Sequence, residues 1–296
     1  MPTLAPTGRQ LGLQVGSARA VVVELGAGLR SLSVGGRDLV QGYGEADPVT
    51  AGRGQHCAPW PNRVRDGRWS WRGQELQLPV NEVTRGTALH GLVRWQPWEV
   101  LQHVADSATL RTLVLPQPGW PVALEHTVTW RLHADGLRCD VRVRNVGSEE
   151  CPFGYAGHPY LVCEPARVDE LVLDLPAAHE VLVDPVRLLP TGSARRDPRP
   201  QALAGVQLDT CFGDLATDSA AVLGPDGHGV QLIADRAVFP WRQVYTGDDL
   251  PVVEQRRTAV ALEPMTCPPD ALRTGQDLVV LSPRETWEGQ WELRAV

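Results

Sequence analysis

The chain has 296 residues, of which 28 are basic and 35 acidic, so its formal net charge is −7. This charge excludes a general polyanion binder, because nucleic acid requires a basic surface. Hydrophobic residues make up 43% of the sequence and charged residues 21%, which is typical of a folded chain with a large core. All 28 basic residues are arginine, and this excludes mechanisms that need a lysine Schiff base or a P-loop lysine.

The sequence contains no signal for export or membrane insertion. Residues 1–10 lack the basic and apolar regions of a signal peptide, and the apolar run 20–25 is far too short to cross a bilayer. The cysteines are spread singly without a CxxC pair, which predicts reduced and mostly buried thiols. They are Cys57, Cys139, Cys151, Cys163, Cys211 and Cys267. We therefore expect a cytoplasmic protein with no membrane partner.

Alternation of apolar and polar residues predicts that most of the chain forms β-strands. Residues 68–78 form a short predicted hairpin around an Arg-Gly turn. Residues 124–132 alternate, an Ala-Asp-Gly turn follows, and residues 137–143 alternate again, which predicts a longer hairpin. A further strand is expected at 229–234. Residues 190–200, with three arginines, are predicted to be an exposed loop.

Helical signals are poor throughout the sequence. The 25 prolines and 29 glycines interrupt the chain so often that we expect short helical turns at most. Many short strands without a βαβ rhythm favour an all-β fold, a sandwich or a barrel, over a parallel sheet. One domain over residues 1–296 is the simplest organisation.

Two early segments combine a polar side chain with a backbone shaped by glycine or proline, as functional residues on a β-scaffold do. Asn62-Arg63 precedes the first hairpin and can aim a guanidinium fork at hydroxyls or carboxylates, or form a surface ion pair with Asp66 or a neighbour. His90 lies next to Gly91, which permits close approach of a ligand. The alternative for His90 is a core histidine that donates to a backbone carbonyl.

Three later residues are also candidates for chemistry. His158 precedes Pro159, which stiffens the backbone that supports the imidazole. Glu263 ends an apolar strand before Pro264, where desolvation would raise the pKa of the carboxyl towards that of a useful base. The alternative is that Glu263 pairs with an arginine. Asp209, taken alone, is typical of a turn aspartate.

Motifs for metals, nucleotides and nucleophilic hydrolysis are missing from the sequence. No HxH or HExxH motif occurs, and His56-Cys57 has no partner at ligand spacing, so we expect no metal. The GxGxxG fingerprint and a nucleophile elbow are also absent, so we expect no cofactor. Ten tryptophans favour a carbohydrate ligand, since indole rings pack on the C–H faces of sugars. Trp60, Trp95 and Trp241 are the candidates for stacking.

Taken in order, these segments resemble the aldose 1-epimerase (galactose mutarotase) family over nearly the whole chain. Each motif is weak alone, and the order and spacing of five together are specific. They are Asn62-Arg63, Leu89-His90-Gly91, Gly157-His158-Pro159-Tyr160, Asp209-x-x-Phe212 and Glu263-Pro264. The resemblance implies a large antiparallel β-sandwich of the supersandwich type and a cofactor-independent isomerase that interconverts the α and β anomers of an aldohexose.

The resemblance also implies roles for individual residues. Glu263 would be the base that removes the proton from the C1 hydroxyl, and His158 the acid that protonates the ring oxygen. The sugar-binding residues expected in this chain are Arg63, His90, Asp209, Asn62, Tyr160 and Trp241. With these roles, the rate is expected to fall at low pH as Glu263 is protonated and at high pH as His158 loses its proton. The partner is then a small-molecule sugar, and the protein a monomer or a homodimer.

One segment departs from the pattern of the best-known sugar mutarotases. Those carry an Asn-His-Ser-Tyr-Phe type of segment where this chain has Gly-His-Pro-Tyr-Leu at 157–161, which retains the acid and leaves the substrate open. A sugar phosphate would need further arginines at the pocket rim. The candidates for that role are Arg65, Arg68, Arg242, Arg256 and Arg257. A non-catalytic sugar-binding sandwich, or a glycoside hydrolase that uses Glu263 with Asp209, would also be compatible with these motifs.

Overall fold

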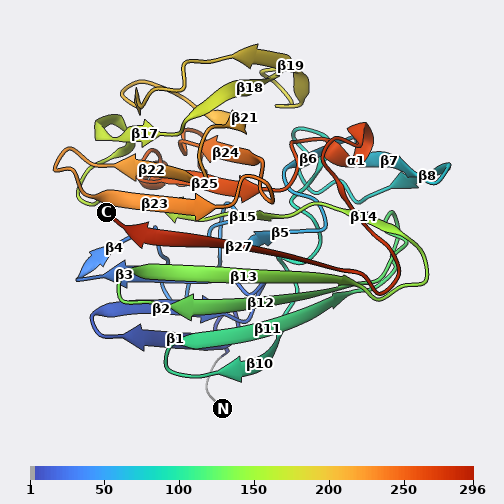
Figure 1. The fold of residues 1–296 in the computed structure, drawn as a ribbon, viewed down its shortest axis with the longest axis horizontal. Helices are drawn as coiled ribbons and strands as arrows, with labels where there is room; N and C mark the ends of the chain where they lie inside the picture. Colours follow the sequence, from blue (N-terminus) through green and yellow to red (C-terminus); the bar gives the residue numbers. More distant parts are fainter. Residues whose placement is uncertain (1–3) are drawn as a thin grey trace.

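Two layers of antiparallel β-sheet dominate the computed structural model, which describes residues 4–296 (Figure 1). The first layer is a nine-stranded sheet. Its strands, in spatial order, are β10 (Glu99–His103), β11 (Ser107–Val114), β12 (Leu124–Leu132), β13 (Gly136–Asn145), β27 (Thr286–Ala295), β23 (Gly229–Ala234), β22 (Ser219–Leu223), β17 (Val172–Asp174) and β20 (Gln201–Ala202). Along β12 every second side chain is buried, as the alternation in the sequence predicts.

The second layer contains an eight-stranded sheet and a four-stranded sheet. The larger sheet has the order β19 (Pro190–Arg195), β18 (Ala177–Val183), β21 (Asp209–Leu215), β24 (Trp241–Tyr245), β25 (Val260–Met265), β15 (Ala156–Gly157) and β5 (His56–Cys57), with β16 (Tyr160–Leu161) also paired to β25. The smaller sheet has the order β1 (Gln10–Val15), β2 (Ala18–Val23), β3 (Leu29–Val34) and β4 (Arg37–Asp38). A bridge between Val40 and Leu161 joins the two sheets edge to edge.

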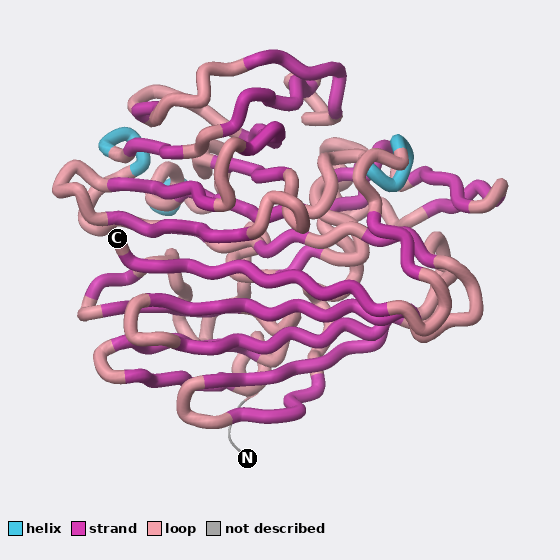
Figure 2. The backbone as a smooth tube through the Cα atoms, viewed as in Figure 1, coloured by secondary structure: helices cyan, strands magenta, loops and turns pink. Residues whose placement is uncertain are grey.

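Short strand pairs and helical turns complete the fold. The pairs are β6 (Arg63–Arg65) with β9 (Thr87–Leu89), β7 (Arg68–Trp71) with β8 (Gln74–Gln77), and β14 (Cys151–Phe153) with β26 (Val279–Leu281). The helical segments are α1 (Ala271–Thr274), η1 (Val168–Glu170) and η2 (Val253–Gln255), visible as isolated turns in Figure 2. Within residues 4–296 no helix combines the length and the apolar character needed to span a membrane.

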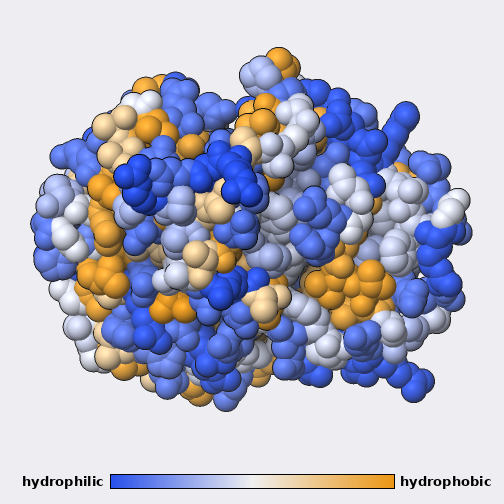
Figure 3. Space-filling view, turned by 45° about the horizontal axis from the view of Figure 1, so that its top comes forward, coloured by the Kyte–Doolittle hydropathy of each residue, from blue (hydrophilic) through white to orange (hydrophobic). Residues whose placement is uncertain are grey.

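The core between the layers uses most of the tryptophans. Trp98, Trp120, Trp130 and Trp291 are all at most 2% exposed, and among the described residues all of their indole N–H groups except that of Trp120 have a partner. Trp130 Nε1, for example, donates to the carbonyl of Ala27 at 2.8 Å. The abundance of tryptophan therefore reflects core packing more than sugar binding. On the outer face in Figure 3, apolar side chains gather in a few patches among hydrophilic ones.

The structure confirms the all-β sandwich, both predicted hairpins and the strand at 229–234. The prediction of a loop at 190–200 is wrong in part, because Pro190–Arg195 forms the edge strand β19 and pairs with β18. An edge strand accommodates proline and charged side chains, since one side of its backbone has no partner strand. The six cysteines are free thiols, and all except Cys163 are buried.

Two histidines lie deep in the core against tryptophans. His56 and His126 are each 1% exposed, and the ring centroid of His56 lies 5.4 Å from that of Trp130. Burial lowers the pKa of both imidazoles to about 3, and the charge of His56 further lowers that of His126. Both rings are therefore neutral in the folded protein at any pH where it is handled.

Acid should destabilise the protein through these histidines. The imidazoles take up a proton near pH 6.5 in the unfolded chain but stay neutral in the folded chain. The folded state therefore keeps its full stability above pH 6.5 and loses unfolding free energy as the pH falls below that value. Between pH 7.5 and 5.5 each histidine should cost about 1.4 kcal/mol of unfolding free energy. Between these two pH values, urea unfolding should show that His126→Gln loses less unfolding free energy than the unchanged protein, and the difference should be that amount. The control His133→Gln removes an exposed histidine and should lose as much as the unchanged protein. The same dependence of unfolding free energy on pH in the unchanged protein and in both variants would contradict this account.

Candidate active site

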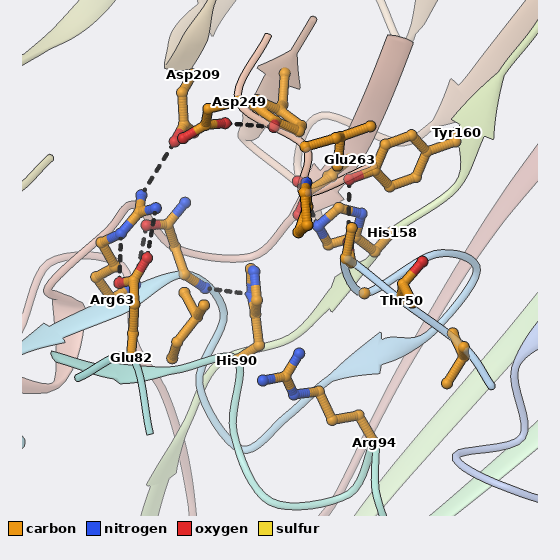
Figure 4. Close-up of a pocket in the computed structure, with 18 of the residues that line it drawn as sticks. Thr50, Arg63, Glu82, His90, Arg94, His158, Tyr160, Asp209, Asp249 and Glu263 are labelled. Atoms are coloured by element: carbon orange, nitrogen blue, oxygen red, sulfur yellow. Dashed lines mark hydrogen bonds and ion pairs between the residues drawn. The ribbon is translucent and has the colours of Figure 1, made fainter. Parts of the chain in front are cut away.

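A cavity of about 400 Å³ opens over the eight-stranded sheet and is covered by loops that precede β6 and follow β9 (Figure 4). Its volume suits a small molecule. It brings together the predicted residues that the sequence spreads over 200 positions: Asn62, Arg63, His90, His158, Tyr160, Asp209 and Glu263. Strand register and backbone geometry explain how each of them reaches the cavity.

The register of β25 places Glu263 directly opposite His158. β15 pairs Ala156 with Met265, and β16 pairs Tyr160 with Ala261. His158 lies midway between Ala156 and Tyr160 in the sequence, and Glu263 lies midway between Ala261 and Met265. The two side chains therefore share one row of the sheet. Their atoms Nε2 and Oε1 are 3.3 Å apart.

Both members of this pair are removed from solvent. The side chain of His158 is 5% exposed and that of Glu263 2%. Burial lowers the pKa of His158 to about 3, with Arg94 adding to the effect, and burial together with Asp209 raises the pKa of Glu263 well above its usual value. These opposite shifts disfavour the charged form of each partner, and two groups in such contact titrate as a pair. Among the described residues, Glu263 Oε2 has no hydrogen-bond partner.

The backbone and one aromatic ring hold His158 in place. Its N–H donates to the carbonyl of Gln55 at 3.0 Å, and its carbonyl accepts from the N–H of Gly54 at 2.8 Å. The ring stacks on Tyr160 with 5.3 Å between centroids and 10° between planes. At Gly52, where φ is +73°, a Cβ atom would lie 3.0 Å from the imidazole, so only glycine leaves room for this ring orientation.

Asn62 and His90 fix each other through two hydrogen bonds. The His90 N–H donates to the carbonyl of Asn62 at 2.9 Å, and the Asn62 N–H donates to His90 Nδ1 at 3.1 Å. Both residues have positive φ, 52° and 60°, and a Cβ on the following Gly91 would meet the carbonyl oxygen of Ala58 at 2.0 Å. Burial, with the charge of His158, lowers the pKa of His90 well below its usual value. Because Nδ1 accepts, the neutral ring carries its proton on Nε2, which is then a donor.

Two carboxylates orient the guanidinium of Arg63. Glu82 accepts from Nε at 2.9 Å and from Nη2 at 3.1 Å, and Asp209 accepts from Nη1 at 3.3 Å. Burial alone would lower the pKa of Arg63, but Asp209 and Glu82 raise it above its usual value. The surface ion pair with Asp66 that the sequence left open is not formed, since Asp66 binds Arg187 instead.

Several residues of the cavity have no local signal in the sequence. Glu82 is separated from Arg63 by 19 positions. Gln243 on β24 supports the site from outside the cavity lining, where it donates to Asp209 Oδ1 at 2.5 Å. Arg85 and Asp249 form an ion pair of 3.2 Å at the rim. Only Arg94, which precedes Trp95 shortly after the histidine motif, stood near a segment that the sequence singled out.

The structure corrects the expectation for Trp241. It lies on the same face of β24 as Tyr245 but four residues away, about 13 Å along the strand. Its ring packs against Met265 and other apolar residues, and its Nε1 donates to Asp277 at 2.9 Å. Trp60 is 2% exposed in the core, whereas Trp95 lines the cavity and is 53% exposed.

The arginines proposed for a phosphate are also elsewhere. Arg242 is buried between the layers, where it donates to backbone carbonyls including that of Ala234 at 2.7 Å. Arg257 pairs with Asp169 and Asp248. None of the suggested set, Arg65, Arg68, Arg242, Arg256 and Arg257, lines the cavity. Within the described residues, no group of three or more His, Cys, Asp or Glu side chains is arranged to hold a metal ion.

Comparisons with known proteins match the chain over most of its length. The family model described as Aldose 1-epimerase matches residues 9–294. The chain is 34% identical over 285 residues to Uncharacterized protein YihR of Escherichia coli (strain K12), covering 93% of this chain and 89% of that protein.

Solved structures share the fold at low sequence identity. The GalM/aldose epimerase homologue from C. elegans superposes with a TM-score of 0.84 at 17% identity, covering 97% of this chain and 98% of that one. The galactose 1-epimerase from Lactobacillus acidophilus NCFM superposes with a TM-score of 0.80 at 17% identity, covering 97% and 94%.

The carboxylate of Glu82 should matter for stability because it compensates a buried cation. Glu82→Gln leaves two Arg63 hydrogen-bond donors without a charged acceptor, and we expect a loss of about 1–3 kcal/mol in unfolding free energy by urea titration. The matched control is Glu149→Gln, which removes an exposed partner of Arg72 and should cost less than about 1 kcal/mol. Equal losses in the two variants would show that the Arg63–Glu82 pair contributes no more than a surface pair.

Proposed function

The chain belongs to the aldose 1-epimerase family, and from this premise we propose that it is a mutarotase that interconverts the α and β anomers of an aldose by opening and reclosing the ring. The observation that carries the proposal is the contact between Glu263 and His158 at the bottom of the cavity. Mutarotation needs one acid and one base beside the hemiacetal, each able to reverse its role. A buried carboxyl and imidazole that hold one proton between them meet that requirement.

The proposed reaction conserves protons at every step. In the reactive form Glu263 is a carboxylate and His158 an imidazolium, and the unpaired Oε2 accepts the proton of the C1 hydroxyl. His158 gives its proton to the ring oxygen as the bond from C1 to that oxygen breaks, which leaves a carbonyl at C1. Rotation about C1–C2 exposes either face, and reclosure returns both protons. The contact of 3.3 Å allows the pair to pass its proton between the neutral and the charged form.

The surrounding residues are proposed to bind hydroxyls and orient the ring. Arg63 is held rigidly by Glu82 and Asp209, so it can present its fork without losing side-chain entropy on binding. His90 offers its Nε2–H as a neutral donor. Asn62 and Tyr160 act mainly by fixing His90 and His158.

This arrangement favours a mutarotase over a glycoside hydrolase. A hydrolase needs a second carboxyl that is free to act on the glycosidic bond. Asp209, the only partner suggested for that role by the sequence, is bonded through both oxygens, one to Arg63 and one to Gln243.

Replacing the proposed base should abolish turnover and spare binding. Glu263→Gln keeps the shape of the side chain but cannot take the hydroxyl proton, so we expect a loss of about 10²-fold or more in kcat. The assay is polarimetry of freshly dissolved α-D-glucose and α-D-galactose in a weakly catalytic buffer, with sugar binding followed by calorimetry. Turnover that is unchanged in this variant would overturn the assignment.

The pH profile should follow the pair as a unit and differs from the profile expected from the sequence. Below the pKa of about 3 to which burial lowers His158, a second proton enters and blocks the base. When the pH rises above the raised pKa of Glu263, the pair loses its shared proton, and no acid remains for the ring oxygen. We therefore expect kcat/KM, corrected for buffer catalysis, to hold within about twofold from pH 7 to 5 and to fall on the alkaline side. An acid limb near 6.5, the ordinary value for histidine, would contradict this.

A further inference from the structure

Arg94 differs from the other arginines that line the cavity. Arg63 is paired with Glu82 and Asp209, and Arg85 with Glu82 and Asp249. Arg94 forms no ion pair and donates no hydrogen bond within residues 4–296, and its Nε is buried without a partner. It is therefore a cation in the cavity wall with no counterion from the protein.

The chain holds Arg94 in this position by contacts that leave its charged end free. Its backbone carbonyl accepts from Gln55 Nε2 at 2.8 Å, and its guanidinium lies 5.3 Å from the ring centroid of Trp95. In Figure 4 the guanidinium points into the cavity below His90, on the side opposite Asp209. Burial lowers its pKa from the usual value, and the charges of Cys57 and Glu82 offset this only in part.

An uncompensated charge at such a site is costly unless a ligand completes it. Arginine presents a planar fork that matches an oxyanion in geometry as well as in charge. The carboxylates nearby do not serve, since Glu82, Asp209 and Asp249 already bind Arg63, Arg85 and neighbouring donors. One positive charge in the wall thus remains for the ligand.

We propose that Arg94 forms an anion subsite and that the sugar bound in this cavity carries one singly charged oxyanion, such as the carboxylate of a hexuronic acid. A single guanidinium surrounded by occupied carboxylates balances one negative charge and leaves a dianion under-compensated. The inference rests on the proposed mutarotase function for the orientation of the ring. His158 faces the ring oxygen, its ring centroid lies 5.1 Å from that of His90, and the guanidinium of Arg94 lies below His90 in Figure 4. We therefore assign the anion to the substituent on C5, one of the two carbons bonded to that oxygen.

The test compares sugars that differ only at C6. Anomer exchange at equilibrium is measured by NMR for D-galacturonate against D-galactose and for D-glucuronate against D-glucose. We expect kcat/KM for at least one uronate to exceed that of its neutral partner by about tenfold or more. In Arg94→Gln the ratio of uronate to neutral sugar should fall to about one, because the loss falls mainly on the charged sugar. The matched control Arg144→Gln removes an exposed charge on β13 and should leave both ratios unchanged.

Other outcomes would overturn the inference in distinguishable ways. An equal loss for charged and neutral sugars in Arg94→Gln would make Arg94 a positioning residue only. A preference for galactose 6-phosphate over galacturonate would refute the single charge. If no sugar is accelerated, the mutarotase proposal fails, and calorimetry then decides the subsite by itself: galacturonate binding that weakens about tenfold in Arg94→Gln supports it, and equal binding refutes it.

Discussion

The antiparallel register of β25 with β15 and β16 is the constraint on which the site depends. β25 is buried along its length and paired on both sides, so it cannot slide. A slip of one residue would turn Glu263 into the core between the layers and bring Leu262 opposite His158, because side chains alternate along a strand. The register of β21 with β24 places Asp209 and Tyr245 on one row, and Trp241 lies on an apolar row further along β24.

Burial then determines how these groups behave. A carboxyl and an imidazole in contact and out of water disfavour their charged forms, so they titrate as a pair and not as independent residues. The arginines are treated differently. Arg63 is compensated by two carboxylates and becomes a rigid donor, whereas Arg94 has no counterion in the part of the chain that the structure describes. The cavity therefore has one arginine whose charge is compensated by carboxylates and one whose charge is not.

Backbone conformations that few residues tolerate complete the cavity. Asn62 and His90 adopt positive φ and bond to each other, and Gly91 packs against the backbone of Ala58 with no space for a side chain. The two hydrogen bonds between Asn62 and His90 select the tautomer in which Nε2 of His90 carries the proton and faces the cavity. The aromatic stack of Tyr160 does the same for the orientation of His158. The reactive groups thus owe their geometry to glycine positions and to contacts between distant segments.

By itself the sequence determined the strand-rich fold, the hairpins at 68–78 and 124–143, and the motifs around Arg63, His90, His158 and Glu263, since alternation and turn chemistry are local properties. It misassigned the edge strand β19 and the place of Trp241, because an edge and a row are defined only by neighbouring strands. Only the tertiary structure decided that Glu82 holds Arg63, that His158 and Glu263 are in contact out of water, and that Arg94 has no partner within residues 4–296. Each of these depends on distance and burial between residues far apart in the chain, which no local pattern encodes.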